Sequence, residues 1–342
     1  MSARLRRFFH VAAAEALHYS GALALWLWFR RKVQRKGEVC VLGLHRVLSK
    51  SEQERSNSLD GMIIRDDTYL ALLAYLQRRF EVVSLETFLS GIENGTAPSK
   101  PRCIITFDDG WLDTYSRALP GLRKFGLPAV VFLTTGSIGS RGGFWVERVK
   151  RAWRTSREGM RSTLSDVWEP GPAAHADLEA VVEWLKRMPT EKRNAILERM
   201  LPANGSSNDP EEVDVMLTWD QAREMSEDGV EIGAHTVSHP LLSYEDEASV
   251  ERELKLAKQV LEENLGEKVL AFAYPNGDWN KRVLEQVVET GYRCAFTTRP
   301  AWHSREKNLY TIPRVLIHEG NITVLAGAFS PAMFALALAG WA

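Results

Sequence analysis

Short apolar runs alternate along this chain with longer segments whose apolar residues recur at helical spacing. The runs predict strands at residues 38–44, 81–84, 102–107, 129–133, 230–234, 269–274, 293–297 and 309–317. Helical spacing fills the intervals, at residues 67–80, 85–94, 113–125, 219–228, 246–265 and 279–290. Strands that are apolar throughout and alternate with helices are typical of a parallel sheet buried beneath helices. The pattern therefore predicts a parallel α/β fold.

The alternation stops between about residues 142 and 216. This segment holds helical spacing at 145–154, 178–187 and 191–200 but no clear strand, and Pro/Gly-rich or Asn/Gly/Ser-rich stretches interrupt it. Such stretches mark loops between elements. We interpret the segment as a helical insertion in the α/β domain, which either shapes a substrate cleft or simply packs on the domain.

The two ends of the chain differ from its middle. We divide the chain into an N-terminal amphipathic, basic segment (1–37), a folded domain (38–320) and an apolar C-terminal helix (321–342). Residues 8–29 are largely apolar, but His10, Glu15 and His18 interrupt them, which argues against a cleavable signal peptide and against a spanning helix.

For each end of the chain, the sequence allows contact with a membrane surface or packing on the folded domain. Cationic clusters flank the N-terminal stretch, so it is either a helix in a membrane interface or an amphipathic helix packed on the domain. Residues 322–342 carry no charge and contain Pro331, and we expect a helix docked on the protein or on a membrane surface. These features predict a cytoplasmic protein, or one held peripherally at the inner membrane through its termini.

Composition narrows the class of protein. The 342 residues are 45% hydrophobic and 25% charged, as in ordinary globular proteins. The net charge of −1 gives no general basic field, so we expect no nucleic-acid partner. Cys40, Cys103 and Cys294 lie in apolar runs without a Cys-x-x-Cys pair, which predicts buried, reduced thiols.

Chemistry-bearing residues follow several predicted strands directly. Asp108 and Asp109 come after one strand, and His235 follows another, with His239 four positions later. Because strand ends in parallel folds collect catalytic groups, we expect these side chains to meet in one pocket. An Asp-Asp-Gly turn or a single histidine would mean little alone. Together, one Asp and two His can hold a zinc-type ion with an open position for water, and the second Asp is free to act as a base.

These motifs resemble those of the polysaccharide deacetylases, the NodB-homology group of carbohydrate esterases (family 4). The resemblance covers roughly residues 39–318. The matching segments are Thr106-Phe107-Asp108-Asp109-Gly110, His235-Thr236-Val237-Ser238-His239, Phe272-Ala273-Tyr274-Pro275-Asn276-Gly277, Ile312-Pro313-Arg314 and Leu316-Ile317-His318. Leu44-His45-Arg46-Val47 is similar to an early Tyr-His-x-Val motif, with Leu44 in place of the tyrosine.

The resemblance implies a distorted (β/α)7 barrel and a set of roles. Asp109, His235 and His239 would bind the metal, Asp108 would be the general base, and His318 would be the general acid. Substrate-binding residues would be His45, Tyr274, Pro275 and Asn276. Many members carry an arginine that orients the base, at the position that Ala273 occupies here; Arg314 could supply that guanidinium from another strand. No Asp motif that would orient the acid is evident near residues 297–302.

The implied activity is metal-dependent removal of N-acetyl groups from a sugar of a bacterial polysaccharide or surface glycan. Zn²⁺ suits the implied ligands best, although Ni²⁺, Co²⁺ or Fe²⁺ could occupy them. One alternative keeps the site but changes the substrate to a small amide or a lipid-linked sugar. Another alternative is a non-catalytic glycan-binding protein on the same fold.

Overall fold

The computed structural model describes residues 11–16, 20–21, 38–94, 100–165, 167–168, 177–201, 212–303 and 308–340. Of the N-terminal segment 1–37, only residues 11–16 and 20–21 fall within these ranges, so the structure addresses its predicted character only there. Within the described residues, no helix has both the length and the apolar character needed to cross a membrane.

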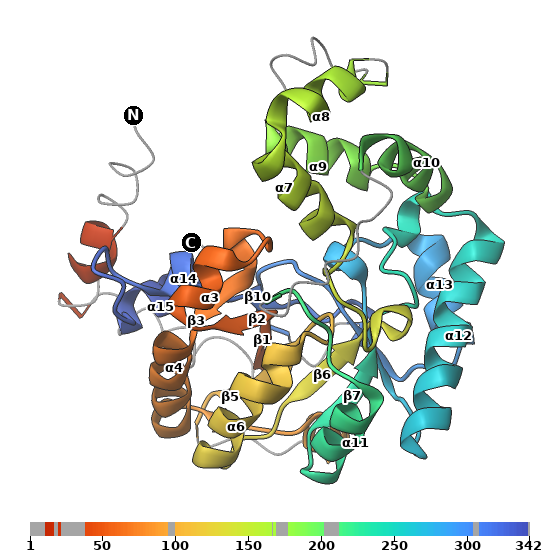
Figure 1. The fold of residues 1–342 in the computed structure, drawn as a ribbon. Coiled ribbons are helices and arrows are strands. Elements are labelled where there is room, and N and C mark those ends of the chain that lie inside the picture. The colour runs from red at the N-terminus through yellow and green to blue at the C-terminus, as the bar shows by residue number, and fades with distance from the viewer. Residues whose placement is uncertain are drawn as a thin grey trace.

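A curved parallel sheet forms the centre of the molecule (Figure 1). Its strands run in the order β10-β1-β5-β6-β7-β8-β9, and β4 pairs with β5 off this path. Their bounds are β1 Val39–Leu44, β4 Glu81–Val82, β5 Arg102–Phe107, β6 Val130–Leu133, β7 Glu231–Ala234, β8 Ala271–Ala273, β9 Cys294–Phe296 and β10 Val315–Leu316. Every pairing is parallel, which confirms the predicted class of sheet.

Residues 312–316 connect the two ends of the sheet. Ile312 forms a parallel bridge with Phe296 of β9, and β10 then pairs with β1 through Leu42 and Val315. The sheet therefore curls back on itself as a barrel-like half-cylinder. Alternate residues of each strand face its interior, where Ile104, Val130 and Phe132 pack, or face the surrounding helices.

Helices cover the outer face of the sheet (Figure 1). They are α4 Asp66–Arg79, α6 Leu119–Phe125, α11 Trp219–Glu227, α12 Glu247–Leu265 and α13 Lys281–Glu289. Helix α5, Leu85–Asn94, instead packs Leu85, Phe88 and Leu89 against the interior cluster. Helix α12 shows how the sequence sets such bounds. The Asp246 side chain accepts a hydrogen bond from the Ser249 N–H at one end, and Gly266 ends the helix in the left-handed conformation.

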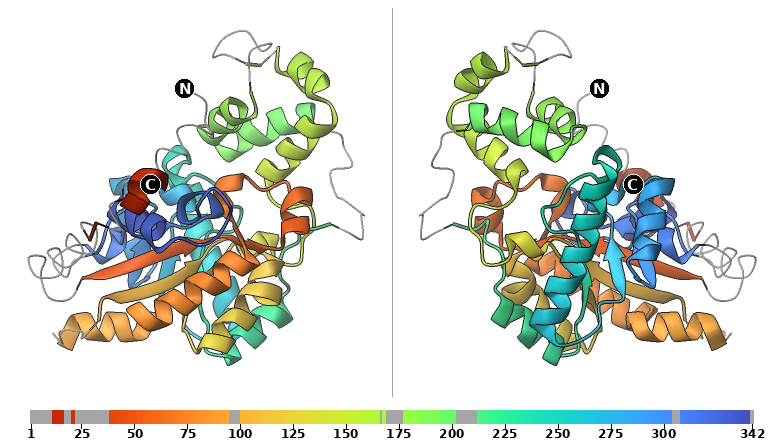
Figure 2. Two further views of the ribbon diagram at one scale, coloured as in Figure 1. Left: turned by 90° about the vertical axis from the view of Figure 1, so that its left-hand side faces the viewer. Right: turned by 90° about the vertical axis from the view of Figure 1, so that its right-hand side faces the viewer.

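The insertion is helical, as its spacing predicts. It contains α7 Trp145–Thr155, α8 Arg157–Leu164, α9 Leu178–Lys186 and α10 Thr190–Met200. These helices group together beside the barrel (Figures 1 and 2) and share an apolar cluster of their own, which includes Val149, Leu164, Val182 and Leu197. Helix α8 was not among the predicted elements.

One local prediction is wrong. Residues 309–317 are not one strand, because Leu309–Thr311 is a 3₁₀ turn capped by Asn308 and only Val315–Leu316 pairs with β1. The helix predicted at 113–125 is confirmed, and its first turns at Thr114–Ala118 are π-helical. A small parallel sheet of β2 Arg46–Leu48 and β3 Ile63–Arg65, with α3 Lys50–Arg55 between them, was missed because its strands are so short.

The apolar C-terminal region is only partly helical. Helix α15 covers Pro331–Ala339, and a shorter helix, α14, covers Glu319–Ile322. Phe334 and Leu338 of α15 join the main core, and Met333 packs against Val11 and Ala14 of residues 11–16. Because its side chains are buried against this chain, α15 is docked on the protein.

Candidate active site

Asp109, His235 and His239 converge at the carboxyl ends of β5 and β7. Asp109 Oδ1 lies 3.6 Å from His235 Nε2 and 3.5 Å from His239 Nε2. One ligand atom from each residue falls within 4.8 Å of the others. Two imidazoles and one carboxylate at this spacing suit a tetrahedral ion that keeps a fourth position open. The chemistry of the donors therefore fits a divalent metal.

Buried hydrogen-bond partners orient His235 and Asp109 through the side-chain atoms that face away from the cluster. His235 Nδ1 lies 2.7 Å from the backbone oxygen of Ala273, so the opposite ring nitrogen faces Asp109. Trp111 Nε1 donates to Asp109 Oδ2 at 2.9 Å, which leaves Oδ1 toward the histidines. Contacts of this kind orient metal ligands and fix the histidine tautomer. Trp111 is fully buried, so it orients Asp109 and does not stack on a sugar.

The backbone is strained at this site. Four non-glycine residues of the described chain have positive φ: Asp109 (78°), Thr236 (65°), His239 (57°) and Asn276 (56°). All four lie in the loops that follow β5, β7 and β8. Non-glycine residues in this conformation cost free energy and cluster at functional sites. Nearby, Gly277 has φ 69°, and an added Cβ would lie 2.1 Å from Thr298 Oγ1, so no other residue fits there.

Arg314 forms a bidentate ion pair with Asp108. Its Nη1 and Nη2 donate to the two carboxylate oxygens of Asp108, each at 2.6 Å, and both side chains are buried. Thr106 and Asp108 face the barrel interior together, two residues apart on β5, and Thr106 Oγ1 also accepts from Arg314 at 3.1 Å. Arg314 thus supplies a guanidinium to Asp108, the contact that the sequence suggested it could make because Ala273 lacks one.

The ion pair sets the protonation of Asp108. Burial alone would raise the pKa of this carboxyl, but the charges of Arg314 and His235 and the Arg314 hydrogen bonds bring its pKa well below the usual range. Burial also lowers the pKa of His235 and of His239 to about 4, against the opposing charge of Asp108. The two histidines are therefore neutral at pH 7, which is the form that binds metals.

Replacing Arg314 with methionine should destabilise the metal-free protein by about 3–5 kcal/mol at pH 7, because it leaves a buried carboxylate without a partner. Without the guanidinium the pKa of Asp108 should rise above its unfolded value. The loss of stability should then shrink as the pH falls through the new pKa, since protonation removes the unpaired charge. Urea unfolding at pH 7 and pH 4 measures both effects.

Arg117 offers the control for this variant. It pairs with Glu52 and Asp66 and is partly exposed, so Arg117→Met should cost less than about 1 kcal/mol. Equal losses for the two variants, or a loss at Arg314 that grows toward low pH, would contradict a strong buried pair at Asp108.

A pocket of about 180 Å³ contains the metal-site residues. His45 and Asn276 line it, as predicted, and His45 Nε2 lies 3.9 Å from Asp108 Oδ2. Tyr274 and Pro275 do not line it, which corrects their prediction as substrate contacts. Both are buried, and the Tyr274 hydroxyl donates to the backbone oxygen of Tyr310 at 3.1 Å.

His318 lies near this pocket but is not among the described residues that line it. Leu316, two positions earlier, does line the pocket. His318 begins α14, and its Nδ1 accepts a hydrogen bond from Gly320 N–H at 3.2 Å. Since Gly43 pairs with Leu316, the segments that carry His45 and His318 run side by side. The role of His318 as the acid therefore stays a prediction.

The insertion supplies one wall of the pocket, which is the first of the two roles that its sequence left open. Its contributions are Phe144, Trp145, Val146, Glu147, Lys186 and Arg193. The Phe144 ring lies 5.0 Å from that of His239. Burial and the charge of Asp214 raise the pKa of Glu147 to about 7. In the sequence, Glu147, Lys186 and Arg193 belong to no recognisable motif, so only the folded structure identifies them as pocket residues.

Arg46 connects this wall to the metal site. Its fully buried guanidinium donates to Asp113 at 2.7 Å, to Asp214 at 2.9 Å and to Ser58 at 2.6 Å, and lies 4.0 Å from the Trp111 ring centre. Asp113 also accepts from the Val47 N–H at 2.6 Å, and its side chain makes no capping hydrogen bond to its own helix.

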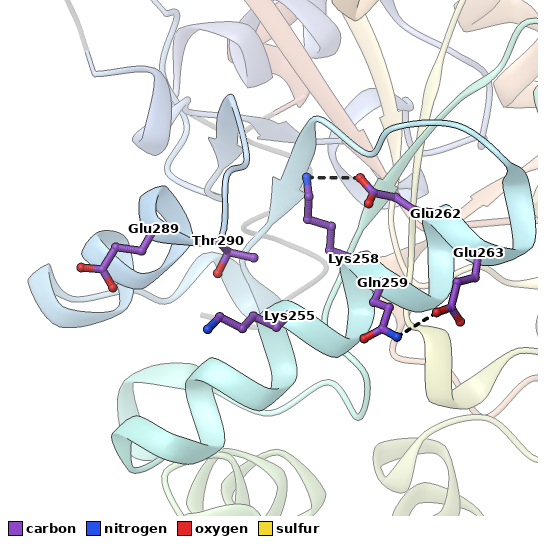
Figure 3. Close-up of a pocket in the computed structure, with 7 residues that line it drawn as sticks. All are labelled: Lys255, Lys258, Gln259, Glu262, Glu263, Glu289 and Thr290. Atoms are coloured by element: carbon purple, nitrogen blue, oxygen red, sulfur yellow. Dashed lines mark hydrogen bonds and ion pairs between the residues drawn. The ribbon is translucent and has the colours of Figure 1, made fainter.

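A second hollow lies on the surface between α12 and α13 (Figure 3). Lys255, Lys258, Glu262 and Glu263 are among its lining residues, and Lys258 pairs with Glu262 at 3.5 Å. It holds none of the metal-site residues. Its mixed, mutually paired charges are typical of a solvated helix surface.

The fold and the site together define a barrel-like α/β protein with an Asp-His-His cluster that fits a divalent metal, beside a buried Asp-Arg pair. The family model for polysaccharide deacetylase matches residues 95–295, more than half of the chain. The chain therefore belongs to the polysaccharide deacetylase family, as its motifs predicted.

One curated relative and three solved structures illustrate the similarity. The Bacillus subtilis (strain 168) protein named "Putative polysaccharide deacetylase YxkH" is 22% identical over 236 residues, which span 69% of this chain and 58% of that protein. The Streptococcus pyogenes deacetylase PplD in complex with acetate matches with a TM-score of 0.57 and 20% identity, over 87% of this chain and all of that one. This chain thus spans less than two thirds of the curated relative.

The other two structures are IcaB and a BpsB deacetylase domain. IcaB from Ammonifex degensii matches with a TM-score of 0.55 and 20% identity, over 90% of this chain and 99% of that one. The BpsB deacetylase domain from Bordetella bronchiseptica matches with a TM-score of 0.53 and 19% identity, over 82% of this chain and 96% of that one. At these identities the structures show the shared fold, which confirms the expected NodB-type barrel.

Proposed function

We propose that this chain is a metal-dependent deacetylase that removes N-acetyl groups from an N-acetylated sugar of a bacterial polysaccharide or surface glycan. The observation that carries the proposal is one pocket that holds an Asp-His-His metal triad and a second, separately positioned carboxylate. Family membership supports the same reaction class. Relatives with solved structures include IcaB and the BpsB deacetylase domain.

Asp109, His235 and His239 would hold the metal, and Zn²⁺ is the ion that we propose for this donor set. Ni²⁺, Co²⁺ and Fe²⁺ accept the same ligands and would be distinguished by elemental analysis. When bound there, a divalent ion acts as a Lewis acid on water and on a carbonyl oxygen.

Asp108 would take the proton from the attacking water. Its carboxylate lines the pocket beside Asp109, and Arg314 holds both of its oxygens. The bidentate pair keeps Asp108 ionised and fixes its orientation, which a general base requires. The buried surroundings exclude bulk water, so these charges act more strongly than they would at the surface.

A second group must give a proton to the departing amine, and two neighbouring histidines compete for this role. The motif comparison assigns it to His318, whereas His45 lines the pocket. Replacing the true acid with glutamine should lower kcat about 10²-fold or more while the metal content stays unchanged. The other substitution should mainly raise KM.

Measuring kcat, KM and metal content for His45→Gln and His318→Gln therefore assigns the acid. Their kcat values should differ by at least about tenfold. If both variants turn over at the wild-type rate, neither histidine is the proton donor.

Acetate release tests the proposed function itself. The protein, loaded in turn with Zn²⁺, Ni²⁺, Co²⁺ or Fe²⁺, is offered chitin oligomers, peptidoglycan fragments and N-acetylated exopolysaccharide. We expect acetate, together with a product lighter by one acetyl group per reacted sugar in mass spectrometry. No release from any N-acetylated sugar with any of these metals would refute the proposal.

Cellular location is a separate proposal. We propose that the protein works in the cytoplasm or peripherally at the inner membrane, with the basic clusters near residues 4–7 and 30–36 toward anionic lipid. Co-sedimentation of the full chain with anionic vesicles tests this. Equal recovery with neutral and anionic vesicles would contradict it.

A further inference from the structure

Two cationic side chains of the insertion line the pocket that holds the metal triad. Lys186 is the last residue of α9, and Arg193 lies in the first half of α10. The pocket also contains Asp108 and Asp109 from the barrel and Glu147 from the insertion itself. The proposed deacetylation uses neither cation, and the sequence motifs include neither.

Arg193 is buried without a carboxylate partner. Its exposed fraction is 3%, and its Nε has no hydrogen-bond partner. Its Nη2 donates to Thr190 Oγ1 at 3.1 Å, and its guanidinium lies 5.1 Å from the Trp145 ring centre. Among the described residues, no carboxylate forms an ion pair with it. A buried guanidinium is costly when unpaired, so this arrangement favours an incoming anion.

The nearest acidic groups are already engaged elsewhere. Glu245 accepts hydrogen bonds from the Thr190 N–H and hydroxyl, each at 2.7 Å. Glu253 accepts from the backbone of Val237 and from the backbone and hydroxyl of Ser238. Glu245 thus holds the start of α10, and Glu253 holds the loop before His239. Their charges favour the charged form of Arg193 from a distance, but neither forms an ion pair with it.

Lys186 has only a weak partner. Its ammonium pairs with Glu183 at 2.8 Å, one turn earlier on the same helix, and Glu183 is largely exposed. Exposed pairs at this spacing contribute little free energy. Lys186 can therefore turn its charge toward a ligand in the pocket at small cost.

We propose that Lys186 and Arg193 form an anion-binding subsite, and that the sugar deacetylated here carries a phosphate or carboxylate group. The inference rests on the proposed deacetylase function and names its substrate class. Guanidinium and ammonium groups are the side chains that bind phosphate and carboxylate most strongly. Since the pocket is small, about 180 Å³, the anion belongs to the reacting sugar or to the unit attached to it.

The test compares matched substrates. Acetate release is measured for a neutral N-acetylated sugar, for the same sugar carrying a phosphate, and for one carrying a carboxylate. A water-soluble sugar phosphate and a lipid-linked sugar phosphate in detergent separate a free anion from a lipid headgroup. We expect kcat/KM to be at least about tenfold higher for an anionic substrate than for the neutral one.

Substitutions on the insertion then locate the preference. Lys186→Gln should reduce the ratio of the anionic to the neutral kcat/KM by about tenfold, mainly through KM. Arg193→Gln should reduce it further, and Arg193→Lys should restore part of it. Since Arg193 is buried and its variants could fail to fold, Lys186 carries the test by itself.

Lys255→Gln is the matched control (Figure 3). Lys255 is also a helical lysine paired with a glutamate on its own helix, Glu251, but it lies outside the pocket. Its substitution should leave the ratio unchanged.

The outcomes separate this inference from the proposed function. Acetate release with no preference for an anionic sugar, or a preference that survives Lys186→Gln undiminished, overturns the subsite and leaves the deacetylase intact. No acetate from any sugar overturns both.

Discussion

Asp108→Asn is expected to lower kcat for acetate release by about 10²–10⁴-fold while the bound metal is retained. Asparagine has nearly the shape of aspartate but cannot take a proton from water. The metal ligands Asp109, His235 and His239 stay in place, so elemental analysis should find the wild-type metal content. KM should change little, because the loss concerns a proton transfer and not ground-state binding.

The variant also breaks the buried pair with Arg314, so stability needs its own control. Asp113→Asn serves this purpose, since Asp113 faces the buried Arg46 at 2.7 Å and does not line the pocket. Both variants should lose stability, but only the first should lose most of its turnover. A metal-loaded Asp108→Asn protein with full biological function and full turnover would exclude Asp108 as the base. Full biological function without turnover would favour a non-catalytic glycan-binding protein.

His235→Ala is expected to remove metal and activity together. The substitution deletes one of three protein ligands and leaves two, too few to compete for the ion at ordinary concentrations. Wild-type protein should gain about 4 kcal/mol of stability when free metal exceeds its Kd about a thousandfold, whereas the variant should gain almost none. Elemental analysis and thermal unfolding with and without Zn²⁺ measure the two effects.

His303→Gln provides the comparison for this result. His303 is a buried histidine that bridges to Val39 and does not line the pocket. It should keep its metal and its metal-dependent stabilisation even if it unfolds at a lower temperature. Retention of both metal and turnover in His235→Ala would overturn the assigned ligand set.

The sequence pattern predicted the parallel sheet and the convergence of Asp108, Asp109, His235 and His239, and the family resemblance added the barrel. The convergence was predictable because the Asp pair and His235 directly follow apolar strands, His239 lies four residues beyond His235, and parallel strands end at one edge. Tyr274 was wrongly assigned to the substrate-binding residues because it, too, follows a strand. Its ring packs near Phe272, two residues earlier on the same side of the strand, so it faces the core instead of the pocket.

Two other outcomes have different causes: one depends on long-range packing, and the other on a local cap and a proline. Lys186 and Arg193 reach the pocket because α9 and α10 pack on α7 and α8 around their own apolar cluster. The predicted strand at 309–317 failed because Asn308 accepts a hydrogen bond from the Tyr310 N–H, which forms a turn, and because Pro313 lacks an N–H for a ladder. Both outcomes follow from tertiary packing and side-chain capping.

The side chain of Arg46 contacts both the insertion and a residue that orients Asp109, so its interactions contribute to the stability of both. The guanidinium contacts Trp111, which holds Asp109, and it bonds Asp214 at one end of the insertion. Through Ser58 it also reaches Glu147 at the other end. We expect an ion that orders Asp109 to stabilise these contacts at both ends of the insertion; by thermodynamic reciprocity, loosening the insertion then weakens ion binding by the same factor. The insertion residues that line the pocket and the Asp109-His235-His239 cluster thus belong to one connected network of contacts, so we expect metal binding to order the insertion.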